Sequence, residues 1–435
     1  MEKIDDKLDI EKIEEPKEFS RFLLFQVILI GILWLADTFF FFFEQNIFNT
    51  YISNVLQLSD LYVSLMVSLS ATVGLIMNFV WGILSDNTRS KYGRRRPFLI
   101  FSLAAGIGMI LYGFAQNYIL CIIFDVLLIG ITSNAVSVAS RALIPDVVDL
   151  EHRGRANGIV QAVSNVGLIM GLVIFLLSMD LLESSDIAVS LRGHIMLLTI
   201  GGIVYASAGV LGFALIKEKP ASELPPKKKF SEELKELINV DLLLEQKNFF
   251  KVIIASAVYQ AGVGSVMALL FIWILQDLPF GTIELFIAIG IGFIFLFPTV
   301  IFLGKLADKY GRKKFMPIVI LLIAIAFFLI PIAQGPPSNY LLFIILIPFM
   351  LLGLLGINTI INTWAQDTLP EGKKGQFYGI FNITLTIPQI VGGILGGLVS
   401  VIFGRVNIFI LAAIFFLASI PLFLLVKETL EFKKE

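Results

Sequence analysis

Charged residues and cysteines are both scarce in this sequence. Asp, Glu, Lys and Arg make up 15% of the 435 residues, whereas soluble proteins carry about 25%. A chain of this length with so little charge cannot cover the surface of soluble domains, so the soluble classes are excluded. The single cysteine, Cys121, excludes an intrachain disulfide framework and a thiolate metal cluster.

The sequence also lacks the residues and motifs that several functional classes require. The chain has two histidines, and its one D-D-x-x-D match, at residues 5–9, lies in the charged N-terminal tail and in no apolar segment, so we expect no metal site, no cofactor and no enzyme activity. No ATP-binding loop is present, which disfavours a primary pump. The net charge of -1 gives no reason to expect a nucleic-acid partner.

Long apolar runs are what the sequence has in abundance. Hydrophobic residues make up 57% of the chain, and runs of about 20 residues are long enough to cross ~30 Å of hydrocarbon as helices. Polar interruptions divide these runs into twelve predicted segments. They are residues 22–43, 61–84, 98–115, 118–144, 156–179, 194–216, 250–275, 283–303, 315–333, 340–365, 376–402 and 407–426.

The basic residues predict the orientation of these segments. With the N-terminus inside the cell, 31 of the 33 basic residues fall on the cytoplasmic side, in loops, in tails or at the cytoplasmic ends of segments, leaving Arg192 and Arg405 outside. A missed helix would invert every later loop and destroy this separation. We therefore predict an all-α polytopic membrane protein with twelve transmembrane helices and both termini in the cytoplasm.

The longest interruption divides the chain into two six-helix halves. Within it, leucines at helical spacing after Ser231 predict an interfacial amphipathic helix, and a solvated charged linker is the alternative. The first twenty residues lack the features of a signal peptide, so we expect a retained tail and no cleaved leader. The predicted parts are a tail at 1–21, a first half at 22–216, a linker at 217–249, a second half at 250–426 and a tail at 427–435.

Two loops repeat one motif, which indicates a duplicated unit. The loops after the second and eighth segments share G-x-L-[SA]-D, then Tyr-Gly, then three basic residues, with Gly304 lying 222 residues after Gly82. A second pair, Asp146 and Asp367, has an offset of 221. The motif residues are Gly82, Asp86, Arg89, Gly93, Arg94 and Arg95 in the first loop, and Gly304, Asp308, Gly311 and Arg312 in the second.

The motif residues and the two aspartates are predicted to form a cytoplasmic gate. Gly82 permits close packing of helices, Gly93 permits a turn with positive φ, and Asp86 can face arginine side chains. Such a charge cluster can latch helices together and release them. The alternative is that the basic residues only enforce topology.

The duplicated Gly-x-Leu-x-Asp…Gly-Arg loop resembles the signature of the major facilitator superfamily. The longer form from Trp81 to Phe98, with RALIPD from Arg141 to Asp146, is more similar to the glycoside-pentoside-hexuronide cation symporters and the sucrose transporters. The resemblance implies the major facilitator fold, in which the first and fourth helices of each half line a central cavity.

Two carboxylates lie inside apolar segments. A charge at mid-bilayer costs at least ~2.5–3.5 kcal/mol, so Asp37 and Asp125 are candidates for substrate binding or proton coupling. Pairing inside the bundle is the alternative for each. Asn134 and Arg141 form a second stripe, roughly opposite Asp125, which the resemblance to sucrose transporters favours as cavity-lining. Arg141 is either a substrate or coupling residue or a gate residue working with Asp146.

The resemblance also bears on the coupling ion and the cargo. The positions matching the family's sodium-binding carboxylates are Gly74 and Asn78, so we expect a proton rather than sodium, and uncoupled transport stays open. Gln161, Gln260, Asn362 and Trp364 are further candidates for binding a sugar, through amide hydrogen bonds and an aromatic face. The alternative is that such amides only join helices.

We therefore expect a monomeric, multi-pass transporter of the cell membrane that moves a sugar or glycoside by proton-coupled symport and alternating access. Its expected partners are a small-molecule substrate and the lipid bilayer. A lipid, drug or organic acid is the alternative cargo. A non-transporting receptor or a membrane enzyme is the alternative from a different class.

Overall fold

A computed structural model describes residues 19–218, 246–335, 339–368 and 374–428. The side chains of residues 150, 297, 308, 366, 374–380 and 382 are outside this description. The predicted amphipathic helix in the linker, most of both predicted tails and the Asp308 side chain therefore lie outside the described residues.

The first group of helices spans residues 21 to 215, and nearly all of it is helical. Ser20 caps the first helix by accepting a hydrogen bond from the Leu23 N–H at 3.1 Å. The elements are α1 (Arg21–Thr50), η1 (Tyr51–Val55), α2 (Asp60–Asn87), α3 (Arg96–Leu99), α4 (Phe101–Tyr112), α5 (Tyr118–Ile122), η2 (Ile123–Ile129), α6 (Gly130–Val147), η3 (Leu150–His152), α7 (Arg153–Leu177), α8 (Met179–Leu182) and α9 (Ile187–Leu215).

The second group spans residues 247 to 424, and no β-strand occurs in the described part of the chain. Its elements are α12 (Lys247–Met267), α13 (Leu270–Gln276), α14 (Thr282–Tyr310), α15 (Arg312–Gln334), α16 (Tyr340–Leu351), η5 (Leu352–Gly356), α17 (Ile357–Asp367), α18 (Lys374–Phe403) and α19 (Asn407–Leu424).

The helices are long and apolar enough to cross a membrane. When directly continuous helices are counted together, the described residues contain 11 such spans. A shorter apolar helix, Arg96–Tyr112, lies at the position of the third predicted segment. The all-helical, multi-span class is confirmed. The count of twelve transmembrane helices stays a prediction.

The internal repeat extends beyond the motif loops. Asn117 caps α5 and Asn339 caps α16, each through its side-chain oxygen. The next residue is a tyrosine in both groups, and each hydroxyl donates to a backbone carbonyl: Tyr118 to Tyr62 at 2.9 Å and Tyr340 to Glu284 at 2.7 Å. Each of these pairs is separated by the same 222 residues as Gly82 and Gly304. The same local structure is therefore built twice.

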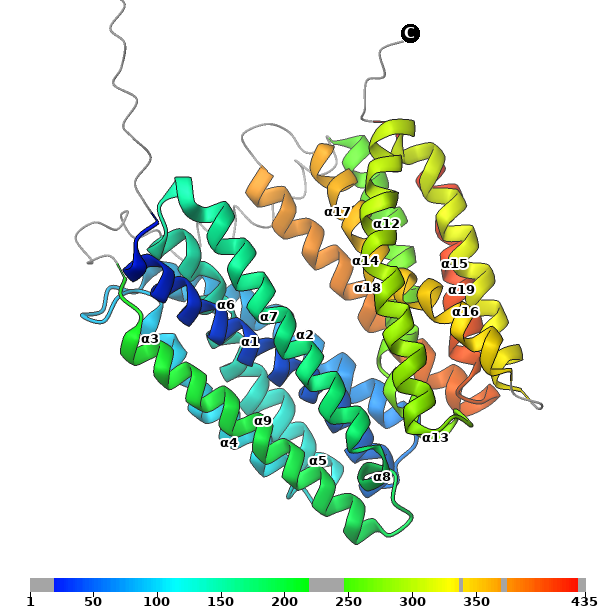
Figure 1. Cartoon of the computed structure of the whole chain (residues 1–435), viewed down its shortest axis with the longest axis horizontal. Helices are drawn as coiled ribbons and strands as arrows, with labels where there is room; N and C mark the ends of the chain where they lie inside the picture. Colours follow the sequence, from blue (N-terminus) through cyan, green and yellow to red (C-terminus); the bar gives the residue numbers. More distant parts are fainter. Residues whose placement is uncertain (1–18, 219–245, 336–338, 369–373, 429–435) are drawn as a thin grey trace, which may run out of the picture.

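The two groups of helices meet at one end and diverge toward the other (Figure 1). They meet near α8 and α13, and the Asn49 side chain of α1 donates to the Ala268 carbonyl there at 2.9 Å. Between the groups, α2 packs along α18. Ser68 of α2 donates to the Ile390 carbonyl of α18 at 3.3 Å.

Glycines on α18 allow very close packing against α12. A Cβ atom added to Gly392 would lie 1.9 Å from the Ala261 carbonyl oxygen, and one added to Gly396 would lie 2.2 Å from that of Ser265. No side chain fits at such distances, so the backbones touch directly. Close backbone approach at small residues is how helices associate where no hydrophobic effect drives them together.

We predict that Gly392→Ala destabilises the folded protein by about 1–3 kcal/mol, because the added methyl group forces α12 and α18 apart. The matched control is Gly290→Ala, since no atom of the described part of the chain lies within 4 Å of an added Cβ at that exposed position of α14. Thermal unfolding in detergent, followed by size-exclusion chromatography, compares the two variants. Equal melting temperatures would show that the close contact is unimportant.

Candidate functional site

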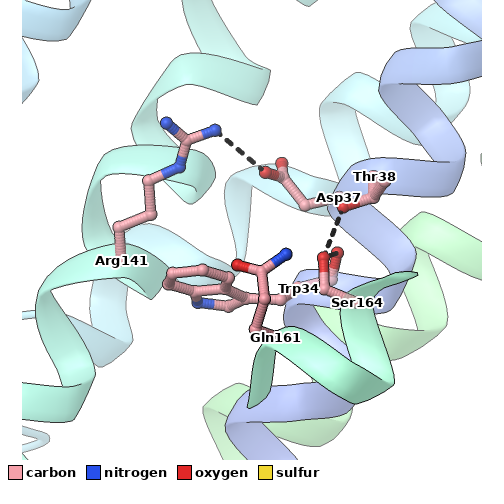
Figure 2. Close-up of a pocket in the computed structure, with 6 residues that line it drawn as sticks. All are labelled: Trp34, Asp37, Thr38, Arg141, Gln161 and Ser164. Atoms are coloured by element: carbon pink, nitrogen blue, oxygen red, sulfur yellow. Dashed lines mark hydrogen bonds and ion pairs between the residues drawn. The ribbon is translucent and has the colours of Figure 1, made fainter. Parts of the chain in front are cut away.

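A polar cavity of about 310 Å³ lies among α1, α6 and α7. This volume is at the lower end of the range of small-molecule sites. Figure 2 shows Asp37 and Arg141 facing each other, with the Trp34 ring and the Gln161 amide close by. The lining residues are Trp34, Asp37, Thr38, Arg141, Gln161 and Ser164.

A carboxylate and a guanidinium group, which carry opposite charges, face each other in this cavity. Nη2 of Arg141 lies 3.8 Å from Oδ2 of Asp37, and the side chains are 68% and 18% exposed. Ser137 of α6 donates a hydrogen bond to the same Oδ2 at 3.1 Å, and Tyr205 of α9 faces Oδ1 at 3.3 Å. The carboxylate is therefore held on both oxygens, whereas the arginine keeps most of its surface open for a ligand.

The walls of the cavity are tied together by hydrogen bonds between helices. The hydroxyl groups of Thr38 on α1 and Ser164 on α7 lie 2.7 Å apart. The indole N–H of Trp34 donates to the Ser140 carbonyl of α6 at 3.3 Å. These bonds fix α1 against both neighbours, so the site sits on rigid elements.

The cavity offers complementary groups to a small polyhydroxyl ligand. Asp37 can accept hydrogen bonds, and the Arg141 guanidinium and Gln161 amide can donate them. The Trp34 ring adds an aromatic face. Trp34 lies three residues before Asp37, which places both on one side of α1. The sequence carried this spacing, but the aromatic residues predicted for the site were others.

Asp125 and Asn134 lie outside this cavity and face α2. Ser70 of α2 donates toward Oδ1 of Asp125 at 3.3 Å and toward Glu44 at 3.4 Å. A Cβ atom added to Gly74 of α2 would lie 3.5 Å from the Asn134 amide. Asp125 is in the π-helical turn η2, whose wider turn rotates the outer part of this span relative to α6. The functional roles of both residues stay predictions.

The predicted candidates of the second group do not line this cavity. Gln260 donates to Asn358 at 2.8 Å and accepts from Gln389 at 3.0 Å, forming an amide chain across three helices. Trp364 is fully buried and stacks on Phe423, with its indole N–H unpaired in the described structure. The predicted roles of Gln260, Trp364 and Asn362 in substrate binding stay untested.

The motif residues form a charge cluster at the end of the molecule where the groups diverge, here named the motif end. Arg94 donates from Nε to Asp146 at 2.8 Å, and Arg95 donates to Asp146 at 3.1 Å and forms an ion pair with Asp86. Hydrogen bonding to Asp146 raises the pKa of Arg94 above its ordinary value. Arg89 donates to backbone carbonyls at the end of α2.

Asp146 is therefore engaged by the loop, and the structure pairs Arg141 with Asp37 instead of Asp146. Arg141 lines the cavity and faces Asp37, and its role as a substrate, coupling or gate residue stays a prediction.

The second motif loop repeats this arrangement, with one correction to the physical reasoning. Arg312 forms an ion pair with Asp367, and Gly93 and Gly311 have φ values of 111° and 89°, which confirms their turn role. The expected close packing at Gly82 is wrong here. Among the described residues, nothing lies within 4 Å of a Cβ added to Gly82 or Gly304, so no neighbouring helix approaches either glycine closely.

Two glutamates that complete the motif loops were missed from the sequence. The Glu218 carboxylate accepts from the backbone N–H groups of Arg94 at 2.8 Å and Arg96 at 2.6 Å. Glu428 accepts from the Lys313 N–H at 2.9 Å. Each glutamate follows a lysine directly after the last helix of its group. That repeated Lys-Glu pair was the signal that could have revealed them.

At the opposite end, here named the Arg405 end, an ion pair joins the two groups of helices. Arg405 donates to Asp60 of α2 at 2.8 and 2.9 Å and to Asp277 of its own group at 2.7 Å. Burial lowers the pKa of Arg405, but hydrogen bonding to Asp60 and the charges of both aspartates raise it, and the net pKa lies above its ordinary value. One arginine thus bridges the two groups of helices.

The sequence matches the model of the Major Facilitator Superfamily over residues 32–392. Because this match covers most of the chain, the chain belongs to that family of membrane transporters. A segment is 29% identical over 114 residues to the general alpha-glucoside permease of Schizosaccharomyces pombe (strain 972 / ATCC 24843). The match covers 22% of this chain and 21% of the length of the permease.

Solved structures of transporters share the fold. A bacterial homolog of the human lysosomal transporter Spinster, in an inward-facing and unoccupied conformation, has a TM-score of 0.72 at 13% identity, covering 94% of this chain and 97% of its own. The nucleoside transporter NupG has a TM-score of 0.72 at 14% identity, covering 92% and 98%. A D-xylose-proton symporter has a TM-score of 0.65 at 15% identity, covering 93% and 98%.

We predict that Glu218→Gln lowers the free energy of unfolding by about 1–2 kcal/mol, because a neutral amide replaces a carboxylate that accepts several backbone N–H groups. The matched control is Glu183→Gln, an exposed glutamate at the Arg405 end. Thermal unfolding of the purified variants measures the difference. A melting temperature that falls equally in both would contradict the assigned contact.

Proposed function

We propose that this protein is a secondary active transporter that imports a sugar or glycoside together with protons. The observation that carries the proposal is the Asp37–Arg141 pair, which faces a cavity also lined by Trp34 and Gln161. Carboxylate, guanidinium, amide and indole groups together suit the hydroxyl groups and C–H faces of a sugar. The similarity to an alpha-glucoside permease supports the same class of cargo.

The proton is proposed to bind at Asp37. A carboxylate inside an apolar segment is costly when it is charged, and Arg141 offsets that cost only while it faces Asp37. Protonation removes the charge and frees Arg141 to bind the substrate. Gly74 and Asn78, at the positions expected for sodium-binding carboxylates, carry no charge, which supports a proton over sodium.

Alternating access is proposed to open the two ends in turn. The basic loops of the motif end are placed in the cytoplasm with both chain termini, by the distribution of lysine and arginine. We therefore propose that the structure represents an inward-open state; in support, the two groups diverge at the motif end and the Arg405–Asp60 contact joins them at the other end. We place the protein in the cell membrane as a monomer with twelve transmembrane helices, counting Arg96–Tyr112 as one of them.

We predict that Asp37→Asn abolishes the accumulation of substrate driven by a proton gradient, because an amide cannot bind and release the proton. Uptake of radiolabelled maltose, an α-glucoside, into proteoliposomes with an imposed pH gradient measures this. Exchange across equal pH should persist, and protein abundance should be normal. The control Asp180→Asn, at an exposed position after α7, should behave as wild type. Retained uphill uptake in Asp37→Asn would overturn the coupling role.

We predict that Asp60→Asn opens the Arg405 end, because it removes the ion pair between the two groups of helices. A cysteine placed at Ser64, a fully buried position of α2 facing Gly397 of α18, reports the opening. A membrane-impermeant maleimide should label it about tenfold faster or more, since removing one partner of a buried pair costs about 3–5 kcal/mol.

The control for that experiment is Asp277→Asn, which removes the other partner of Arg405 but leaves the contact between the groups intact. Its labelling rate should change much less. Equal labelling rates in the two variants would show that the bridge between the groups does not hold this end closed. The native Cys121 is fully buried and is replaced by alanine in the labelling background.

A further inference from the structure

The hydroxyl group of Tyr205 faces two acceptors at the same distance. Its oxygen lies 3.3 Å from Oδ1 of Asp37 and 3.3 Å from the backbone carbonyl oxygen of Ser133. The side chain comes from α9, whereas Asp37 belongs to α1 and Ser133 to α6. Three helices therefore converge on one phenol group.

The ring of Tyr205 is held in place independently of its hydroxyl group. The side chain is 2% exposed, and its ring stacks on Phe40 with 4.1 Å between centroids and an interplanar angle of 24°. Phe40 lies three residues after Asp37 on α1. The position of the hydroxyl oxygen is thus set by packing, and only its hydrogen is free to turn.

A phenol carries one hydrogen, so it can donate to only one of the two acceptors at a time. An ionised Asp37 has no hydrogen to give and needs a donor on Oδ1. A protonated Asp37 has a hydrogen to give and needs an acceptor. The Tyr205 oxygen can serve both states, provided that its own hydrogen has a second acceptor, and the Ser133 carbonyl is that acceptor.

We propose that Tyr205 is a positioning residue that allows Asp37 to gain and lose its proton without leaving a buried group unpaired. With Asp37 ionised, Tyr205 donates to Oδ1. With Asp37 protonated, the carboxyl O–H donates to the Tyr205 oxygen, and Tyr205 donates to the Ser133 carbonyl. The proton comes from water in the cavity and returns to it, and Tyr205 keeps its own hydrogen throughout. The proposal rests on the proposed function in taking Asp37 as the carboxyl group that changes charge.

The other oxygen of Asp37 lies near a fixed positive charge. Oδ2 accepts from Ser137 and faces Arg141, whose guanidinium has no acceptor and favours the ionised form. Tyr205 is the partner on Oδ1, and its hydroxyl group is suited to both forms. Unpaired buried polar groups are strongly disfavoured, so a phenol that turns one hydrogen keeps both states of the carboxyl accessible.

The charged and titratable groups around Asp37 come from three helices. In the described structure they are Arg141 of α6, Tyr205 of α9 and, along α1 itself, Glu44. From α7 the cavity receives Gln161 and Ser164, which do not titrate in the relevant range. A change confined to Tyr205 therefore alters one of three neighbours of the carboxyl group.

The test is an infrared pH titration of the purified protein in liposomes, which needs no substrate. The carboxyl C=O band of Asp37 is assigned by its loss in Asp37→Asn. In Tyr205→Phe, which keeps the stacked ring, the titration midpoint should rise by about one pH unit, because a hydrogen bond to the charged form is lost and such bonds are stronger than those to the neutral form. An unchanged midpoint would overturn the proposal.

The matched control is Tyr259→Phe. Tyr259 is fully buried, stacks on Phe416 at 4.5 Å, and donates at 2.7 Å to the Gly353 carbonyl. Its loss should leave the Asp37 midpoint unchanged, and an equal shift in this variant would contradict a specific role for Tyr205.

Two further measurements keep the outcome decisive. If Tyr205→Phe does not fold, 3-fluorotyrosine is incorporated in place of Tyr205. It is a stronger hydrogen-bond donor with the same ring, so it should lower the titration midpoint of Asp37. An unmoved midpoint refutes the proposal. Uphill uptake by Asp37→Asn refutes the proposed function alone, because the infrared shift in Tyr205→Phe does not depend on transport.

Discussion

The hydrocarbon core of a membrane offers no hydrogen-bond partner, so each polar group within the apolar helices must be satisfied by another part of the protein. The structure meets this constraint by joining helices in pairs and triplets. Asp37 binds Ser137 and Tyr205, which ties α1 to α6 and α9. Gln260 joins α12 to α17 and α18 through two amides. The few polar residues thus fix how the apolar helices are rotated.

The same constraint explains how much the sequence could predict. Apolar segments and repeated loops indicated the helices and the family, because each signal lies within a short stretch of chain. Asp37 stood out because charge inside an apolar run is costly, and Arg141 stood out through the resemblance to the sucrose transporters. Tyr205 and Trp34 did not stand out, because aromatic residues are common throughout these helices and only the packing of α1 against α6 and α9 gives these two a role.

Local backbone geometry within the helices is a second feature of the fold that the sequence does not predict. A regular helix would place Asp125 and the Asn134–Arg141 stripe on opposite faces. The π-helical turn η2 changes that register within the span, and a π-helical turn, η5, also occurs in the corresponding helix of the second group. No residue type signals such a turn. The rotation of the part of this span that carries Asp125 relative to the part that carries Arg141 is therefore known only from the structure.

The duplicated halves share their loops but not their charge. At 222 residues beyond Asp37 the second group has Tyr259, whose hydroxyl is bound to a backbone carbonyl. The carboxylate that faces the cavity thus belongs to the first group. The bridge at Arg405 joins both groups. Under the proposed function, the ligand therefore binds mainly to the first group, and the Arg405 bridge couples that group to the second.

The most direct test of this account measures the two ends of the protein together. Spin labels at Tyr92 and Tyr310 report the motif end, and labels at Ser185 and Ile283 report the Arg405 end, since all four side chains are exposed. Pulsed electron–electron double resonance spectroscopy measures the distance between the two labels at each end, with and without maltose and at low and high pH. The account predicts that one distance shortens as the other lengthens. Distances that change together, or not at all, would contradict it.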